Sequence, residues 1–110
     1  MSQYSSWFEL RAESVEQGAP RGAAALQVRR AEGVVTYPDG KSAMVWFGYS
    51  SSDAMKTLQK VFADELETPG SRGQGHLLFR YHQGPSARAS IIRRANHFAK
   101  KFGVPPLFNQ

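Results

Sequence analysis

The sequence predicts an α+β domain: a small, mainly antiparallel sheet of three to four strands with helices packed on it, in the order strand, strand, helix, strand, helix. Two observations predict this class. Apolar segments separated by proline and glycine turns are typical of strands, and two later segments repeat apolar residues every three or four positions, as helices do. With 110 residues, 41% of them hydrophobic, the chain has the size and apolar content of a single domain spanning residues 1–110.

The first half of the chain predicts a β-hairpin. Residues 23–29 and 33–37 are strand-like, and the turn that follows has proline, aspartate and glycine at positions 38–40. Proline fixes φ at the first corner of a turn, and glycine accepts a positive φ, so the hairpin is centred on Asp39 and Gly40. Residues 43–47 are apolar almost throughout, which predicts a central strand covered on both faces.

A helix and a third strand follow. Residues 50–53 are serines and an aspartate, which supply N-cap candidates. Residues 68–70 end this helix, the glycine-rich segment 70–75 is expected to be a flexible connection, and residues 76–82 alternate as a half-buried strand does. The apolar stripe of the helix consists of Met55, Leu58, Phe62 and Leu66.

The last predicted element is a helix that opens at residues 84–86 and ends at residues 103–106. Its polar face carries Arg93, Asn96, His97 and Lys100, flanked by Arg94 and Lys101. Its buried stripe consists of Ile91, Ala95, Phe98 and Phe102.

Charge is distributed unevenly along the chain. Residues 1–67 hold nine acidic and seven basic side chains, whereas residues 68–110 hold seven basic and no acidic ones. Clustered positive charge repels itself, and phosphate is the commonest partner that compensates it. The alternative is a solvated face that only keeps the domain soluble.

Several chemistries find no support in the sequence. Cysteine is absent, which excludes disulfides and thiolate sites. The three histidines, at positions 76, 82 and 97, lack metal-ligand spacing. The acids Asp64, Glu65 and Glu67 at the end of the first predicted helix are expected to be solvated. We therefore predict no catalytic residue, no metal and no cofactor.

The N-terminal residues have no positively charged and apolar leader, and no run of about 18 apolar residues occurs. The sequence therefore predicts a cytoplasmic protein with no membrane partner.

Three short strings lie in the predicted order of elements: PRGAAAL at residues 20–26, VWFGYSSSD at residues 45–53 and PPLFN at residues 105–109. Together they resemble landmarks of GIY-YIG nuclease domains, over roughly residues 20–109. The resemblance implies the same strand, strand, helix, strand, helix order.

The catalytic groups of that family are mostly missing at the matching positions. Metal-assisted phosphodiester hydrolysis needs an acid to hold the cation and a group to handle the proton, so the resemblance implies a scaffold that has lost catalysis. The two tyrosines would fall at Ala24 and Trp46, the arginine near Lys56 or Thr57, and the glutamate near Ala95, while Gly48 and Asn109 remain.

We therefore predict a non-catalytic nucleic-acid-binding domain that uses the basic C-terminal helix and the strand and loop before it. The predicted contact residues are Arg72, Arg80, Arg88, Arg93, Arg94, His97, Lys100 and Lys101.

Two alternatives stay open. One is a protein-interaction or self-assembly module with no nucleic-acid ligand, in which residues 43–47 or Trp7 and Phe8 form a docking surface rather than core. The other is a nuclease with an altered catalytic constellation. For residues 1–20 the sequence leaves strand and helix undecided, although Trp7 and Phe8 are expected to dock on the core.

Overall fold

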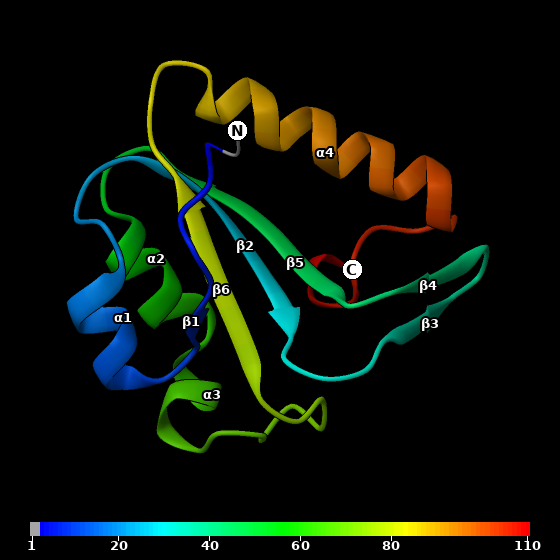
Figure 1. The fold of residues 1–110 in the computed structure, drawn as a ribbon, viewed down its shortest axis with the longest axis horizontal. Helices are drawn as coiled ribbons and strands as arrows, with labels where there is room; N and C mark the ends of the chain where they lie inside the picture. Colours follow the sequence, from blue (N-terminus) through cyan, green and yellow to red (C-terminus); the bar gives the residue numbers. More distant parts are fainter. Residues whose placement is uncertain (1–2) are drawn as a thin grey trace.

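The computed structural model describes residues 3–110, which form a four-stranded antiparallel sheet, a separate two-stranded hairpin, and helices on both faces of the sheet (Figure 1). This architecture confirms the predicted α+β class. The sheet has the order β1-β6-β2-β5, and the hairpin pairs β3 with β4. The strands are β1 (Phe8–Glu9), β2 (Ala24–Arg30), β3 (Val35–Tyr37), β4 (Gly40–Ser42), β5 (Met44–Ser50) and β6 (Leu77–His82). The helices are α1 (Ala12–Gly18), α2 (Ala54–Val61), α3 (Ala63–Glu67), α4 (Ala87–Phe102) and a final 3₁₀ turn, η1 (Leu107–Asn109).

Strand β2 is the centre of the sheet, because it pairs with β5 on one side and with β6 on the other. Successive side chains of a strand point to opposite faces. Ala24, Leu26 and Val28 therefore face one layer of helices, and Ala25 and Gln27 face the other. None of these five residues is more than 1% exposed, so both faces of β2 are covered.

The apolar segment that predicted a central strand lies at the edge of the sheet instead, since β5 has only β2 as a neighbour. It is nevertheless covered on both faces. Val45 and Trp46 pack in the core that holds α1 and α2, and Phe47 packs in the core under α4. A continuous apolar run indicates that both faces of a strand are buried, but it does not indicate how many strands pair with it. The sequence therefore predicted a central position for a strand that lies at the edge.

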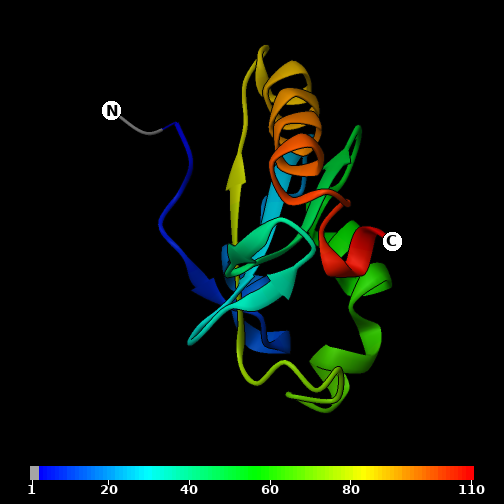
Figure 2. The ribbon, with the colours of Figure 1, turned by 90° about the vertical axis from the view of Figure 1, so that its right-hand side faces the viewer.

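Two separate cores hold the layers together. Figure 1 shows the sheet running diagonally between α4 at the upper right and α1 and α2 at the lower left. Leu58 and Phe62 fill the core on the α2 side. Ile91 and Phe98 of α4 fill the other, where the Tyr37 ring meets Phe98 edge-on at 5.0 Å. Figure 2, which views α4 almost along its axis, shows the N-terminal segment on the β6 side.

The predicted helix boundaries are confirmed at their caps. The Asp53 side chain accepts a hydrogen bond from the Lys56 amide (3.0 Å), as an N-cap does. The apolar stripe continues through Phe62, but the helix breaks there into α2 and α3. Helix α4 ends at Gly103, whose φ of 86° is the left-handed conformation that glycine adopts readily.

The N-terminal stretch, which the sequence left open, contains both a strand and a helix. Phe8 in β1 lies opposite Phe79 in β6, and the two rings stack with centroids 5.4 Å apart. This contact confirms that Phe8 docks on the core. Val15 anchors α1 in the same core and is fully buried.

The expectation that Glu65 is solvated was wrong, because its side chain is only 1% exposed. Its carboxylate accepts hydrogen bonds from the Gly70 amide (2.8 Å), the Ser71 hydroxyl (3.3 Å) and the Arg72 amide (3.3 Å). An acid at a helix end can thus turn inward and satisfy the backbone donors of the following loop. The glycine-rich segment is therefore organised around a buried carboxylate.

Candidate nucleic-acid interface

The outer surface of α4 is basic along its whole length. Ile91 and Phe98 turn one side of the helix into the core, so the charged positions between them point outward. Among residues 3–110 the ion pairs are Arg11 with Glu9 and Arg72 with Asp64, and neither involves α4. The exposed basic side chains of α4 are Arg88, Arg93, Arg94, His97, Lys100 and Lys101.

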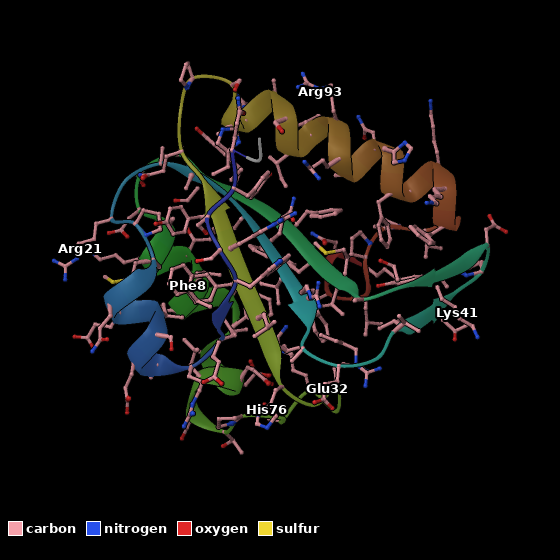
Figure 3. All side chains as sticks on the ribbon, in the orientation of Figure 1. Phe8, Arg21, Glu32, Lys41, His76 and Arg93 are labelled. Carbon is pink, nitrogen blue, oxygen red and sulfur yellow. The ribbon has the colours of Figure 1, made fainter. Side chains whose placement is uncertain are left out.

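Part of this surface lines an open groove of about 450 Å³ on one flank of α4. Its polar wall holds positively charged or ionisable groups and one hydroxyl, and its apolar floor comes from rings that also belong to the core under α4. The wall residues are Ser90, Arg93, Arg94, His97 and Lys101, and the floor residues are Phe47, Phe98 and Phe102. We call this feature the α4 groove. Figure 3 shows Arg93 projecting from α4 on the side away from the sheet strands.

A second basic cluster lies beside the groove, on the face of the sheet that α4 covers. Arg80 of β6 is partly buried, and its Nε donates a hydrogen bond to Gln27 Oε1 at 2.9 Å. Its guanidinium carbon lies 4.6 Å from the centre of the Tyr4 ring and 4.4 Å from that of Trp7. Such distances are those of cation–π contacts.

Each of these rings also contacts a second arginine. The guanidinium carbon of Arg94 lies 5.0 Å from the Tyr4 centroid, and that of Arg29 lies 5.2 Å from the Trp7 centroid. Contacts therefore link Arg94, Tyr4, Arg80, Trp7 and Arg29 in one continuous arginine–aromatic series. Arg94 belongs both to this series and to the α4 groove.

Two hydrogen bonds between Ser5 and Tyr81 anchor the segment that carries the aromatic members of the series. The Ser5 amide donates to the Tyr81 carbonyl (2.8 Å), and the Tyr81 amide donates to the Ser5 hydroxyl (3.1 Å). Residues 4–7 consequently follow β6 toward β1. The series thus joins the N-terminal segment, the middle of the sheet and α4.

Positive charge accumulates around Arg80. Burial lowers the pKa of Arg80 from its usual value, and the nearby guanidiniums of Arg94 and Arg29 lower it further. An arginine stays protonated at neutral pH despite such a shift. The cluster therefore carries positive charge that no acidic side chain of residues 3–110 neutralises through an ion pair.

The structure unites some of the predicted contact residues and separates others. Arg93, Arg94, His97 and Lys101 line the groove. Arg80 and Arg94 both contact the Tyr4 ring. The remaining two residues on α4, Arg88 and Lys100, are exposed but lie outside the groove lining.

Arg72 is used inside the fold. It forms an ion pair with Asp64 at 2.9 Å, and its guanidinium carbon lies 4.4 Å from the centre of the Phe62 ring and 4.8 Å from that of Phe108. Phe62 belongs to the core on the α2 side of the sheet. Arg72 is therefore removed from the α4 groove, and we leave it out of the candidate interface.

Sequence reasoning missed Arg29, Tyr4 and Trp7 as members of this site. The available signal was the polar side of the predicted strands, because Gln27 and Arg29 alternate with buried apolar residues in one and Arg80 does so in the other. The register pairs Gln27 with Arg80, which brings the polar positions onto the same face. That pairing could not be read from either segment alone.

The positions that the resemblance assigns to catalytic groups have structural roles here. Ala24 is 1% exposed at the start of β2. Trp46 is packed against Phe62 with ring centroids 5.3 Å apart. Ala95 faces the core under α4. Within residues 3–110, no three histidine or acidic side chains come together as metal ligands would.

Comparisons with protein-family models, with curated proteins and with solved structures find no match to this chain. None of the helices formed by residues 3–110 is long and apolar enough to span a membrane.

Proposed function

We propose that this protein binds nucleic acid without cleaving it and that the α4 groove holds the phosphate backbone. The observation that carries the proposal is that Arg93, Arg94, His97 and Lys101 line one open groove without an acidic residue among them. Phosphate contacts from basic side chains supply most of the affinity of non-specific nucleic-acid binding.

The form of the groove favours a ligand over a merely solvated face. Charges that serve solubility are interspersed with acids, whereas α4 contains none. Below its basic wall the groove is also lined by the ring of the partly buried Phe102 and that of the buried Phe47. A basic rim above an aromatic floor suits a strand that offers both phosphates and bases.

Absence of cleavage is the second part of the proposal. It is supported by the residues at the positions that the resemblance assigns to catalysis, because Ala24 and Ala95 cannot hold a metal or move a proton. We expect labelled DNA and RNA to stay intact during prolonged incubation with the protein and Mg²⁺ or Mn²⁺. Cleavage that co-purifies with the protein and persists in a re-purified sample would contradict this part.

Fluorescence anisotropy with a labelled single strand and a labelled duplex tests binding. We expect affinity to fall steeply with added salt. We expect the double variant Arg93→Glu/Lys101→Glu to bind at least about ten-fold more weakly, with a salt slope reduced by about 0.7–0.9 per lost phosphate contact.

The matched control is Lys56→Glu/Lys60→Glu. Both lysines are exposed on α2, beyond the opposite face of the sheet, and the change in net charge is the same. The control should bind like the wild type. Equal losses in both variants would mean that net charge alone attracts the ligand, and lack of wild-type binding at low salt would overturn the proposal.

Most of the features that suggested a protein-interaction module lie within the fold, whereas Trp7 is only partly buried. Val45, Trp46 and Phe47 are buried, and Phe8 stacks on Phe79. The large apolar residues that stay exposed within residues 3–110 are Val34, Tyr49 and Ile92. Tyr49 and Ile92 line one small groove of about 190 Å³ between β5 and α4, which is too small for the extended apolar patch typical of a stable protein interface. We therefore rank nucleic-acid binding first, and light scattering across a concentration series tests the alternative.

A further inference from the structure

We propose that Arg29, Arg80 and Arg94 form a discrete site for a phosphate monoester, as found at the end of a nucleic-acid strand or on a free mononucleotide. This inference rests on the proposed function and specifies which part of the ligand the protein recognises. The proposed site is the arginine–aromatic series and not the α4 groove, although Arg94 belongs to both.

Two shared rings link the three guanidiniums in a series. Arg80 and Arg94 each lie within 5.0 Å of the Tyr4 centroid, and Arg80 and Arg29 each lie within 5.2 Å of the Trp7 centroid. They come from three different elements, β2, β6 and α4, so packing of the whole fold fixes their positions. A site assembled from rigid elements is already organised for its ligand.

The hydrogen-bonding capacity of these arginines is mostly unused. Arg80 Nε donates to Gln27 and Arg29 Nε donates to the Arg30 carbonyl. Among residues 3–110, the terminal nitrogens of Arg29, Arg80 and Arg94 have no hydrogen-bond or ion-pair partner. A guanidinium held over an aromatic ring keeps these N–H groups in its own plane, where they can meet an anion.

Gln27 supplies an independent observation that points to an oxygen ligand. Its side chain is 1% exposed, and its Oε1 must face Arg80 because Arg80 Nε is a donor. The amide Nε2 next to that oxygen is buried and has no partner in the described part of the chain. A buried donor without an acceptor is costly, and a phosphate oxygen bound to Arg80 would bring an acceptor into its neighbourhood.

The charge of the site selects a monoester. A phosphodiester carries one negative charge. A phosphate monoester carries about 1.5 to 2 negative charges near neutral pH, and it offers three strong acceptor oxygens. Arginine forks that bind such a group give short, charge-assisted bonds. The repulsion of the partly buried Arg80 by Arg94 and Arg29 is relieved best by the more highly charged group.

The aromatic members of the series add a surface for the rest of the ligand. Trp7 is only partly buried, and its indole ring lies next to Arg80 and Arg29. A base attached to the bound phosphate could stack on such a ring. Because Arg94 also lines the groove, a strand held there can place its phosphorylated end among the three arginines.

Anisotropy with three oligonucleotides of one sequence tests the inference: one with a 5′-phosphate, one with a 3′-phosphate, and one with hydroxyl ends that is one nucleotide longer and so has the same number of phosphates. We expect one phosphorylated end to raise affinity about ten-fold over the hydroxyl-ended strand. Equal affinities would overturn the monoester site and leave the groove proposal standing.

The diagnostic variant is Arg29→Gln, because Arg29 lies outside the α4 groove. It should abolish the preference for the phosphorylated end, whereas a general loss of positive charge would weaken binding of the phosphorylated and hydroxyl-ended strands by the same factor. The control is Arg21→Gln, which removes one exposed charge beside α1, whereas Arg93 projects from α4 (Figure 3). The preference should survive in the control, and its loss there, or its persistence in Arg29→Gln, would count against the assignment.

A titration that does not depend on strand binding separates the two proposals. Inorganic phosphate and a nucleoside monophosphate, added to the labelled protein, should shift the Nε–H NMR signals of Arg29, Arg80 and Arg94. Shifts without any binding of oligonucleotides would support a free mononucleotide as the ligand and contradict the nucleic-acid proposal. Absence of shifts for all three arginines at millimolar phosphate would overturn the site.

Discussion

The side-chain amide of Asn109 pairs with both backbone groups of Phe47. Asn109 Oδ1 accepts a hydrogen bond from the Phe47 amide (2.9 Å), and Asn109 Nδ2 donates to the Phe47 carbonyl (2.8 Å). Because β5 is an edge strand, these backbone groups have no neighbouring strand on that side. The C-terminal turn η1 thus closes part of the open edge and fixes Phe47, whose ring forms the floor of the α4 groove.

Replacing Asn109 should destabilise the fold and expose the edge of β5. Asn109→Ala leaves the amide and carbonyl of Phe47 without their partners, and we expect a loss of about 1–3 kcal/mol in the free energy of unfolding. The freed edge should also promote self-association. Urea denaturation measures the first effect, and sedimentation velocity at increasing concentration measures the second.

Gln110→Ala is the matched control for this prediction. Gln110 is exposed at the end of the chain and makes one hydrogen bond, to the Pro105 carbonyl at 2.9 Å. It should unfold at nearly the same urea concentration as the wild type. If Asn109→Ala were equally stable, the amide pair would be too solvated to hold the strand edge.

The indole of Trp46 lies directly on Gly48, two residues further along the same face of β5. A Cβ atom added at Gly48 would come within 2.1 Å of the Trp46 ring, a distance that forces the ring to move. Since Trp46 also packs edge-on against Phe62, a displaced ring disturbs the core under α2. Gly48→Ala should therefore lower the free energy of unfolding by about 1–3 kcal/mol, as overpacking does.

Thermal and urea denaturation check this value against Gly22→Ala. A Cβ atom at Gly22 would meet only the side-chain nitrogen of Gln83, at an ordinary 3.7 Å. The control should be neutral or slightly stabilising, because alanine restricts the unfolded chain. Similar stabilities for the two variants would show that Trp46 has room to move aside.

Features set by neighbouring residues could be predicted from the sequence. Asp53 caps α2 and Ile91 and Phe98 anchor α4 because these roles depend on spacing along one element. The edge position of β5 could not be predicted, because strand order is decided by pairing between segments far apart in the chain. Glu65 was misjudged for a related reason, since its partners belong to the loop that follows and not to the helix.

The candidate site also contains residues that local spacing predicts and residues that only long-range pairing brings together. The basic face of α4 follows from helical spacing alone, so Arg93 and His97 were predicted together. The contact between Trp7 and Arg29 joins the N-terminal segment to the central strand. It depends on the register of β6 with two partners, which no local pattern encodes.

The ion pair of Asp64 with Arg72 predicts a loss of stability in acid. The hydrogen bond from Arg72 holds the pKa of Asp64 below its ordinary value of 3.8. A carboxylate with a lowered pKa stabilises the fold above its unfolded pKa, and the contribution disappears as pH falls through the folded one. The difference in unfolding free energy between wild type and Asp64→Asn should therefore be constant above about pH 5 and shrink below it.

Urea denaturation at several pH values measures this difference. Because the Asp64 side chain is 56% exposed, high salt should reduce it at every pH. Glu16→Gln, at an exposed position of α1 outside both ion pairs, controls for the loss of one acid. A difference that grows toward low pH would contradict the assigned direction.

Tyr37 ties the hairpin to the C-terminal segment and predicts the opposite behaviour in base. Its hydroxyl donates to the Met44 carbonyl (2.7 Å) and accepts from the Leu107 amide (3.1 Å). Burial raises the pKa of Tyr37 above its ordinary 10.0, although the Leu107 amide partly opposes this. A neutral acid with a raised pKa stabilises the fold below its unfolded pKa, and this contribution is lost as pH rises above it.

Tyr37→Phe should accordingly be less stable than the wild type by about 1–3 kcal/mol at neutral pH, because two backbone groups lose their partner. From about pH 9 upward the wild type should lose stability faster than the variant, so that the two converge in strong base. Tyr49→Phe, in which the replaced residue is 37% exposed, is the control and should follow the wild type throughout. Parallel pH curves for the wild type and Tyr37→Phe would mean that the Tyr37 hydroxyl ionises as readily in the folded chain as in the unfolded one. Such curves would contradict the statement that burial raises the pKa of Tyr37.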